Sequence, residues 1–257
     1  MITAGIDVGL EAIKIVIVKD GEVAGKAQGL SGGAGREQAV GRLWDEALKE
    51  AGIGASDVQK VAATGAGKYD VAFADKTVTE PIAGARAARY YLPGATSVVD
   101  AGASQTRVVT LREGGEIEEV ALNQKCGAGL GSQLRYLARR LEMTLDEISA
   151  LPPDAAAGFT VNDGCVVFIE LDSLELLNEG AAPTQVAGAV NDAIAVRLNM
   201  ILNDKITPAK DTTVLIGGVA KNAAVVNALK ARSGIGFVIP ADAEYGCALG
   251  CALLAGS

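Results

Sequence analysis

Two stretches of the chain share one pattern of apolar, acidic and basic positions. In the first, Ile6-Asp7-Val8-Gly9 is followed after four residues by Lys14-Ile15-Val16-Ile17-Val18. In the second, Val99-Asp100-Ala101-Gly102 is followed after four residues by Arg107-Val108-Val109. Two β-branched runs joined by a glycine turn predict a β-hairpin in each place. A repeat of this length indicates two duplicated half-domains.

The remaining apolar positions alternate between strand and helix periods. Residues 35–51 place apolar side chains at helical spacing, at Val40, Leu43, Trp44, Ala47 and Leu48. The same reasoning predicts strands at 58–64 and 214–216 and helices at 81–92, 131–142, 165–179, 184–204 and about 220–231. This alternation predicts an α/β fold. We place the two halves at residues 1–95 and 96–257, with the C-terminal helix as a candidate to complete the first half.

That last helix carries small residues at one spacing, namely Gly246, Ala248, Gly250 and Ala252. Small residues allow a backbone to lie close to a flat neighbour. The neighbour is either another helix, in which case the face is purely structural, or an adenine ring. The sequence leaves both readings open.

Composition and charge narrow the function classes. The 257 residues carry a formal charge of −8, which argues against nucleic acid or an anionic membrane as partner. ATP remains compatible, because backbone N–H groups and one or two lysines can hold phosphates. The chain has no histidine, which removes Ser-His-Asp chemistry and His-ligated zinc. No signal pattern and no transmembrane run is found, so we expect a cytoplasmic protein.

Each hairpin turn has the features of a phosphate site. The glycine lets a ligand approach the backbone, and the N–H groups of the turn can surround a phosphate. Asp7 and Asp100 end the first strands, where they can hold Mg²⁺ through water. An ordinary hairpin turn is the alternative for either copy taken alone.

Together with the strand that ends in Gly217-Gly218, the paired hairpins resemble the actin/Hsp70/sugar-kinase superfamily (ASKHA, ribonuclease H-like). The resemblance implies actin/Hsp70-like halves around a nucleotide cleft. The hairpins would face each other across that cleft and hold the ATP phosphates, with the Gly-Gly turn on the nucleoside side.

The four cysteines are Cys126, Cys165, Cys247 and Cys251. Cys126 and Cys165 each precede a predicted helix, where the helix dipole and free N–H groups favour a thiolate. Two cysteines are too few for a four-cysteine cluster, but a symmetric dimer would supply four. Two unrelated buried thiols are the alternative. We interpret Cys247 and Cys251 as packing residues of the last helix.

Four segments, in order along the chain, resemble the BadF/BadG/BcrA/BcrD ATPase family, which includes activators of 2-hydroxyacyl-CoA dehydratases and ATPase subunits of benzoyl-CoA reductases. They are Ala63-Thr64-Gly65-Ala66-Gly67-Lys68, Lys125-Cys126-Gly127-Ala128-Gly129-Leu130-Gly131, Asn162-Asp163-Gly164-Cys165-Val166-Val167-Phe168 and Gly217-Gly218-Val219-Ala220-Lys221-Asn222. The two cysteine segments are the most specific of the four.

This resemblance implies an ATPase that drives low-potential electrons into a partner. Cys126 and Cys165 from two protomers of a homodimer would hold one [4Fe-4S] cluster. The phosphates and Mg²⁺ would lie among Asp7, Gly9, Lys14, Asp100 and Gly102, and the nucleoside near Gly217, Gly218 and Asn222. The implied partners are an iron–sulfur acceptor enzyme and a ferredoxin or flavodoxin as electron donor.

Both phosphate loops depart from the family pattern. The first, Leu10-Glu11-Ala12-Ile13, lacks the usual Ser and Thr, and we interpret Glu11 as a solvated turn residue. The second, Asp100-Ala101-Gly102-Ala103-Ser104-Gln105, is closer to the benzoyl-CoA-reductase type. We expect Asp100 to orient the attacking water, with Gln105 as the second choice.

Two other function classes remain open. A small-molecule kinase of the same fold, such as a sugar kinase, would use ATP without a cluster. An actin-like assembly protein would form nucleotide-linked polymers without iron. Within the electron-transfer reading, the acceptor is a 2-hydroxyacyl-CoA dehydratase, a benzoyl-CoA reductase or a double-cubane-cluster reductase. A pair with a similar subunit is the alternative to a homodimer.

Overall fold

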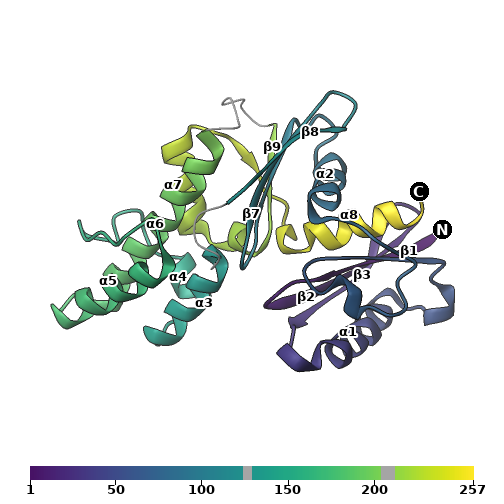
Figure 1. Cartoon of the computed structure of the whole chain (residues 1–257), viewed down its shortest axis with the longest axis horizontal. Helices are drawn as coiled ribbons and strands as arrows, with labels where there is room; N and C mark the ends of the chain where they lie inside the picture. The colour runs from purple at the N-terminus through teal and green to yellow at the C-terminus, as the bar shows by residue number, and fades with distance from the viewer. Residues whose placement is uncertain (124–128, 204–211) are drawn as a thin grey trace.

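The computed structural model describes residues 1–123, 129–203 and 212–257. The first sheet contains β1 (Ile2–Val8), β2 (Ala12–Lys19), β3 (Glu22–Leu30), β4 (Lys60–Thr64) and β5 (Lys76–Thr77). The second contains β6 (Ser97–Ala101), β7 (Thr106–Leu111), β8 (Ile117–Leu122), β9 (Thr213–Ile216) and β10 (Phe237–Val238). Their strand orders are β3-β2-β1-β4-β5 and β10-β9-β6-β7-β8 (Figure 1).

The two sheets repeat one topology. β1 pairs antiparallel with β2 and parallel with β4, and β6 pairs antiparallel with β7 and parallel with β9. In this register Asp7 faces Lys14 and Asp100 faces Arg107. The repeated spacing in the sequence is therefore a repeated cross-strand pair. The predicted α/β fold with duplicated halves is confirmed.

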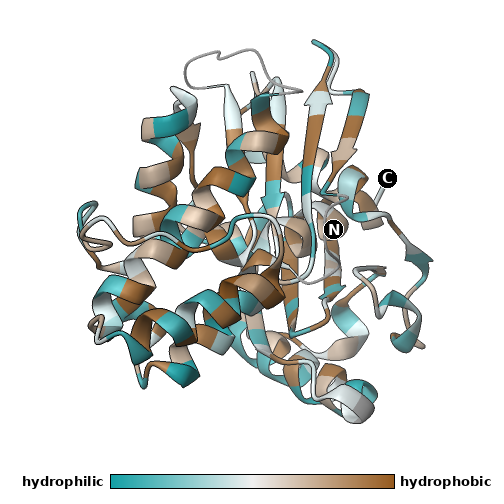
Figure 2. Ribbon diagram, turned by 60° about the vertical axis from the view of Figure 1, so that its left-hand side comes forward, coloured by the Kyte–Doolittle hydropathy of each residue, from teal (hydrophilic) through white to brown (hydrophobic). Residues whose placement is uncertain are grey.

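Eight α-helices flank the sheets in the described part of the chain. They are α1 (Arg36–Ala51), α2 (Glu80–Tyr91), α3 (Leu130–Arg140), α4 (Leu145–Ser149), α5 (Val166–Asn178), α6 (Pro183–Asn203), α7 (Ala223–Ser233) and α8 (Gly246–Ala255). Helix α1 packs against β2 and β3, whereas α3, α5, α6 and α7 share a core with the second sheet. Figure 2 shows hydrophobic residues along the strands, while the helices alternate between hydrophobic and hydrophilic segments.

The predicted start of α7 near residue 220 is wrong. Gly218–Lys221 form a single 3-10 turn, and α7 begins at Ala223. The Oδ1 atom of Asn222 accepts a hydrogen bond from the N–H group of Val225 at 3.0 Å. This cap fixes the first turn, because the early N–H groups of a helix lack partners within the helix.

Helix α8 uses its small residues for packing inside the protein. A Cβ atom added at Gly250 would lie 1.8 Å from the carbonyl oxygen of Ala83 in α2. A Cβ atom added at Gly5 in β1 would lie 2.0 Å from the carbonyl oxygen of Ala248. The purely structural reading of this face is therefore confirmed.

Helices α2 and α8 each pack across the predicted division of the chain. Helix α2 contacts β6 and β7 of the second sheet, and α8 contacts β1, β2 and β4 of the first. The boundary between residues 95 and 96 stays a prediction. None of the described helices is long and apolar enough to span a membrane.

Candidate active site

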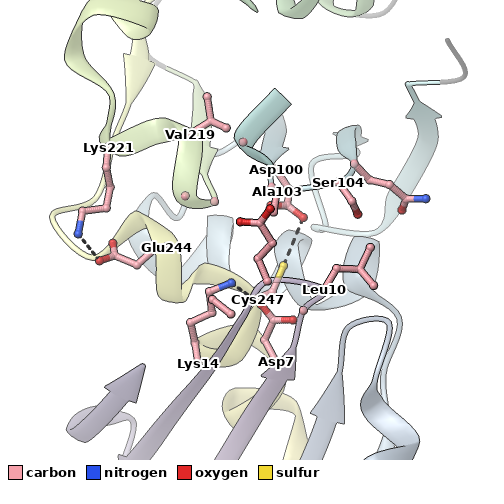
Figure 3. A pocket seen from close by; sticks show the side chains of 18 of the residues that line it. Asp7, Leu10, Lys14, Asp100, Ala103, Ser104, Val219, Lys221, Glu244 and Cys247 are labelled. Atoms are coloured by element: carbon pink, nitrogen blue, oxygen red, sulfur yellow. Dashed lines mark hydrogen bonds and ion pairs between the residues drawn. The ribbon is translucent and has the colours of Figure 1, made fainter. Parts of the chain in front are cut away.

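A cavity of about 420 Å³ lies where the two hairpins approach each other (Figure 3). Its walls come from both hairpin turns, from the turn after β9, and from α3, α4 and the start of α8. The lining includes every nucleotide-site residue predicted from the sequence, namely Asp7, Gly9, Lys14, Asp100, Gly102, Gln105, Gly217, Gly218 and Asn222. The fold thus brings together residues from both ends of the chain.

The first hairpin places Asp7 and Lys14 side by side at the floor of the cavity. The Nζ atom of Lys14 lies 3.5 Å from Oδ2 of Asp7, and the two side chains are 17% and 14% exposed. Burial alone lowers the pKa of Lys14, but the carboxylates of Asp7 and Asp100 outweigh it and raise that pKa above its usual value. Lys14 therefore presents a positive charge to the cavity at neutral pH.

Turn geometry explains why residue 9 is a glycine. The N–H group of Gly9 donates to the carbonyl oxygen of Ala12 at 3.1 Å. A Cβ atom at Gly9 would lie 2.8 Å from that same oxygen. The second hairpin closes in the same way, with the N–H group of Gly102 donating to the carbonyl oxygen of Gln105 at 3.0 Å. Both turns bring bare backbone to the cavity.

Arg107 organises the second hairpin. Its guanidinium donates to Oδ2 of Asp100 at 3.0 Å, to Oε1 of Glu80 at 2.9 Å and to Oε1 of Gln105 at 2.6 Å. Burial raises the pKa of Asp100 above its usual value, although Arg107 opposes the shift. Arg107 thus holds Asp100 and Gln105, the two residues predicted from the sequence to orient the attacking water. Glu80, from the first turn of α2, carries no sequence signal for this contact.

Cys247 lies between the two hairpins (Figure 3). Its sulfur is 3.6 Å from Oδ2 of Asp100 and 3.9 Å from the carbonyl oxygen of Glu80. Burial, followed by the charge of Asp100, raises the pKa of the Cys247 thiol well above its usual value. The thiol therefore stays protonated and can donate to the Asp100 carboxylate. Cys247 and Cys251 are both buried, as predicted, but Cys247 also lines the cavity.

The turn after β9 forms the opposite wall. Gly217 has a φ of 94°, and a Cβ atom there would lie 2.4 Å from the carbonyl oxygen of Ala101. Gly218 has open space where a Cβ atom would stand. The amide of Asn222 caps α7 and donates to Oδ1 of Asn191 at 3.1 Å. Its predicted contact with a nucleotide stays a prediction.

Two ion pairs at the cavity were not predicted. Lys221 lies 2.7 Å from Oε1 of Glu244, whose side chain is 7% exposed. The Oε2 atom of Glu11 lies 2.8 Å from Nε of Arg135 in α3. The interpretation of Glu11 as a solvated turn residue is therefore wrong. Partners so far apart in the sequence leave no local pattern from which the pairing could be read.

Of the two predicted cluster ligands, Cys165 is not among the residues that line the cavity. Cys126 falls outside the described residues. Cys165 is the N-cap residue of α5 and is half-buried, as its position before a predicted helix indicated. The side chain of Asn162 accepts from the N–H groups of Gly164 and Cys165 at 2.8 and 3.1 Å, which shapes the turn. Within residues 1–123, 129–203 and 212–257, no three His, Cys, Asp or Glu side chains are grouped to hold a metal ion.

Three comparisons bear on this site. The sequence model of the BadF/BadG/BcrA/BcrD ATPase family matches residues 4–255. The activator of lactoyl-CoA dehydratase from Anaerotignum propionicum is 32% identical over 255 residues, which cover 99% of this chain and 97% of that protein. One of the subunits of benzoyl-CoA reductase from Thauera aromatica is 33% identical over 236 residues, or 89% of this chain and 82% of that protein.

A solved structure extends the similarity to three dimensions. The activator of the 2-hydroxyisocaproyl-CoA dehydratase from Clostridium difficile, with bound ADPNP, matches with a TM-score of 0.86 and 25% identity. The match covers 99% of this chain and 94% of that one.

Proposed function

The chain belongs to the BadF/BadG/BcrA/BcrD ATPase family, and we propose that it is an ATP-driven activator that passes low-potential electrons from an iron–sulfur cluster to a partner enzyme. The observation that carries the proposal is the arrangement at the cavity. Two hairpins, each with a carboxylate facing a cation, meet there across a space of about 420 Å³. The protein with bound ADPNP has the same fold, which supports a nucleotide as the ligand.

The lining residues have the chemistry that MgATP requires. The glycine turns at Gly9 and Gly102 let phosphates approach the backbone, and Lys14 supplies a positive charge that is partly buried. Asp7 and Asp100 offer the hard oxygen ligands that Mg²⁺ prefers. When bound, Mg²⁺ would neutralise phosphate charge. Gly217 and Gly218 would lie at the nucleoside, where Gly218 leaves open space.

In this proposal Asp100 orients the attacking water and receives its proton. The carboxylate is held by Arg107 and by the Cys247 thiol, so its direction is fixed before the nucleotide arrives. Gln105 is the second choice, because its Oε1 atom already accepts a short hydrogen bond from Arg107. Positioning of this kind is the main protein contribution to phosphoryl transfer.

Cys126 and Cys165 would hold the [4Fe-4S] cluster jointly with the same residues of a second protomer. The described part of this site fits such a role, since Cys165 stands at the N-terminus of α5. Beside it, Val167, Phe168 and Leu171 are 58%, 53% and 54% exposed. Apolar side chains at this density suit an interface, and a homodimer would cover them. A ferredoxin or flavodoxin would be the electron donor that reduces the cluster again after each transfer.

The acceptor would be an enzyme that needs a strongly reducing electron. The names of the relatives point to a 2-hydroxyacyl-CoA dehydratase or a benzoyl-CoA reductase, and a double-cubane-cluster reductase is the third option. In each case ATP would change the relative position of the two halves and thereby the exposure of the cluster.

Iron analysis tests this function. The protein would be purified without oxygen, and iron and sulfide would be determined per protomer for the wild type, Cys126→Ala, Cys165→Ala and the control Cys251→Ala. We expect about two irons and two sulfides per chain in the wild type and the control, and loss of both in the two other variants. An iron-free protein that hydrolyses ATP after reconstitution would contradict electron transfer and favour the small-molecule kinase.

A further inference from the structure

An ion pair spans the cavity between the first hairpin and a helix of the second half. Glu11 lies in the turn between β1 and β2, and Arg135 lies in the middle of α3. The Oε2 atom of Glu11 is 2.8 Å from Nε of Arg135, and both residues line the cavity. The pair therefore joins one phosphate loop to the helix that follows the Cys126 segment.

This contact is electrostatic without being a well-directed hydrogen bond. The Nε atom of Arg135 is buried and makes no hydrogen bond, although the Glu11 carboxylate is within reach. By contrast, the Arg107 guanidinium donates to three acceptors. A guanidinium without aligned acceptors is held less firmly, so Arg135 is the more easily redirected of the two arginines.

Every cationic side chain in the described lining of the cavity has a carboxylate partner. The pairs are Lys14 with Asp7, Arg107 with Asp100, Arg135 with Glu11 and Lys221 with Glu244. A polyphosphate brings strong negative charge to this site, and it binds best if one of these cations changes partner.

The Glu11–Arg135 pair can change partner at a lower cost than the pairs of Lys221 and Arg107. Moving Lys221 would leave the carboxylate of Glu244, which is 7% exposed, without its counter-charge. Moving Arg107 would likewise leave the carboxylates of Asp100 and Glu80 without their shared cation. Glu11 is 26% exposed and can turn toward water once Arg135 leaves it.

We propose that Arg135 is a phosphate-binding residue, which Glu11 holds until a nucleoside triphosphate takes the carboxylate's place. The inference rests on the proposed function, since it deepens the nucleotide site. The proposed role also explains how the first phosphate loop can hold a carboxylate, Glu11, where the family pattern has Ser and Thr. A carboxylate at that position would repel phosphate unless a cation beside it could be transferred to the ligand.

The second phosphate loop contacts the same helix. The N–H group and the hydroxyl of Ser132 both donate to the carbonyl oxygen of Ala103 at 3.0 Å. A Cβ atom at Gly129 would lie 1.8 Å from that oxygen, so the start of α3 rests directly on the loop. Helix α3 is thus linked to one phosphate loop by hydrogen bonds and to the other by Arg135. A change of partner at Arg135 would remove the link between α3 and the first phosphate loop and leave the hydrogen bonds to the second loop in place.

Nucleotide affinities of variants at Arg135 and at Glu11 distinguish a phosphate-binding role from a merely structural ion pair. The dissociation constants of MgATP and MgADP would be measured by calorimetry on the anaerobically purified full chain. For Arg135→Gln we expect ATP binding to weaken on the order of 10-fold, and ADP binding to weaken less. For Glu11→Gln we expect ATP binding to strengthen several-fold, because the competitor for Arg135 is gone. Arg139→Gln, an exposed position on α3, serves as the control.

The two effects have opposite signs, which a structural ion pair would not produce. Weakening of ATP binding by the same factor in both variants would overturn the inference, and so would unchanged affinity in Arg135→Gln. In either case a wild type that still binds MgATP leaves the proposed function intact. A wild type with a full cluster that binds no ATP would overturn both. If Arg135→Gln does not fold, Arg135→Lys and Glu11→Gln carry the test, with the lysine variant keeping the ATP preference.

Discussion

The sulfur of Cys247 lies 3.6 Å from Oδ2 of Asp100, the same oxygen that accepts a hydrogen bond from Arg107. The thiol comes from the first turn of α8 and the carboxylate from the end of β6. One oxygen atom is therefore held from two directions, by a guanidinium and by a weak S–H donor.

Removal of this thiol is expected to change the pH dependence of ATP hydrolysis. The S–H contact lowers the pKa of Asp100 against the larger upward effect of burial, so Cys247→Ala should raise that pKa further. A base loses activity as the pH falls through its pKa, and the acid limb of kcat/KM should therefore move to higher pH. Cys247→Ser should move the limb back, because a hydroxyl also donates. An unchanged profile in Cys247→Ala would contradict this role, with Cys251→Ala as the control.

Loss of Arg107 should destabilise the protein. Arg107→Ala leaves the carboxylates of Asp100 and Glu80 without their shared cation, at positions that are 11% and 19% exposed. Breaking a buried pair in this way costs about 3 kcal/mol of unfolding free energy, and the loss should shrink at acid pH, where Asp100 is protonated. Denaturant unfolding measures it. Arg42→Ala, which breaks an exposed pair with Glu46, should cost about 0.5 kcal/mol or less.

Substitutions at the two glycines after β9 should have different effects, one on the stability of the protein and the other on nucleotide binding. Gly217→Ala forces a side chain into a backbone with φ of 94° and against the carbonyl oxygen of Ala101, so the thermal unfolding temperature should fall. Gly218→Ala meets no protein atom within 4 Å. It should keep the unfolding temperature and weaken nucleotide binding, because its methyl group stands at the cavity. Equal effects of the two variants on stability would contradict this distinction.

Packing of α8 on α2 predicts a third stability effect. Gly250→Ala would place a methyl group 1.8 Å from the carbonyl oxygen of Ala83, and the helices could accept it only by moving apart. We expect a loss of about 3 kcal/mol in the free energy of unfolding. Gly41→Ala, in α1 with open space around it, is the matched control and should stabilise the protein by up to about 1 kcal/mol.

The fold and the Asp7–Lys14 and Asp100–Arg107 pairs of the cavity could be predicted from the sequence, because both depend on short-range patterns. Asp7 with Lys14 and Asp100 with Arg107 are cross-strand neighbours, so a fixed spacing encodes each pair. The glycine turns were predictable for a similar reason, because each is closed by a hydrogen bond between residues three apart in the sequence.

Contacts between distant segments were not predictable in this way. The partner of Glu11 leaves no trace in the sequence of its turn, because Arg135 lies on a helix of the other half. Glu80 and Glu244 reach the cavity only through tertiary packing. Helix α4 was missed despite a local signal. Thr144 and Glu147 form a capping box, in which the side chain of each bonds the backbone N–H of the other at 3.1 and 2.7 Å.

The packing of α8 on β1 also has a consequence for synthesis of the protein. Thr3 donates a hydrogen bond to the carbonyl oxygen of Ala252, and Val16 and Val18 share a buried cluster with Ala248 and Leu249. In the order of synthesis β1 comes long before α8, which covers it. The first sheet therefore has one uncovered apolar face until all the elements between β4 and α8 have been made, which favours slow maturation and a need for chaperones.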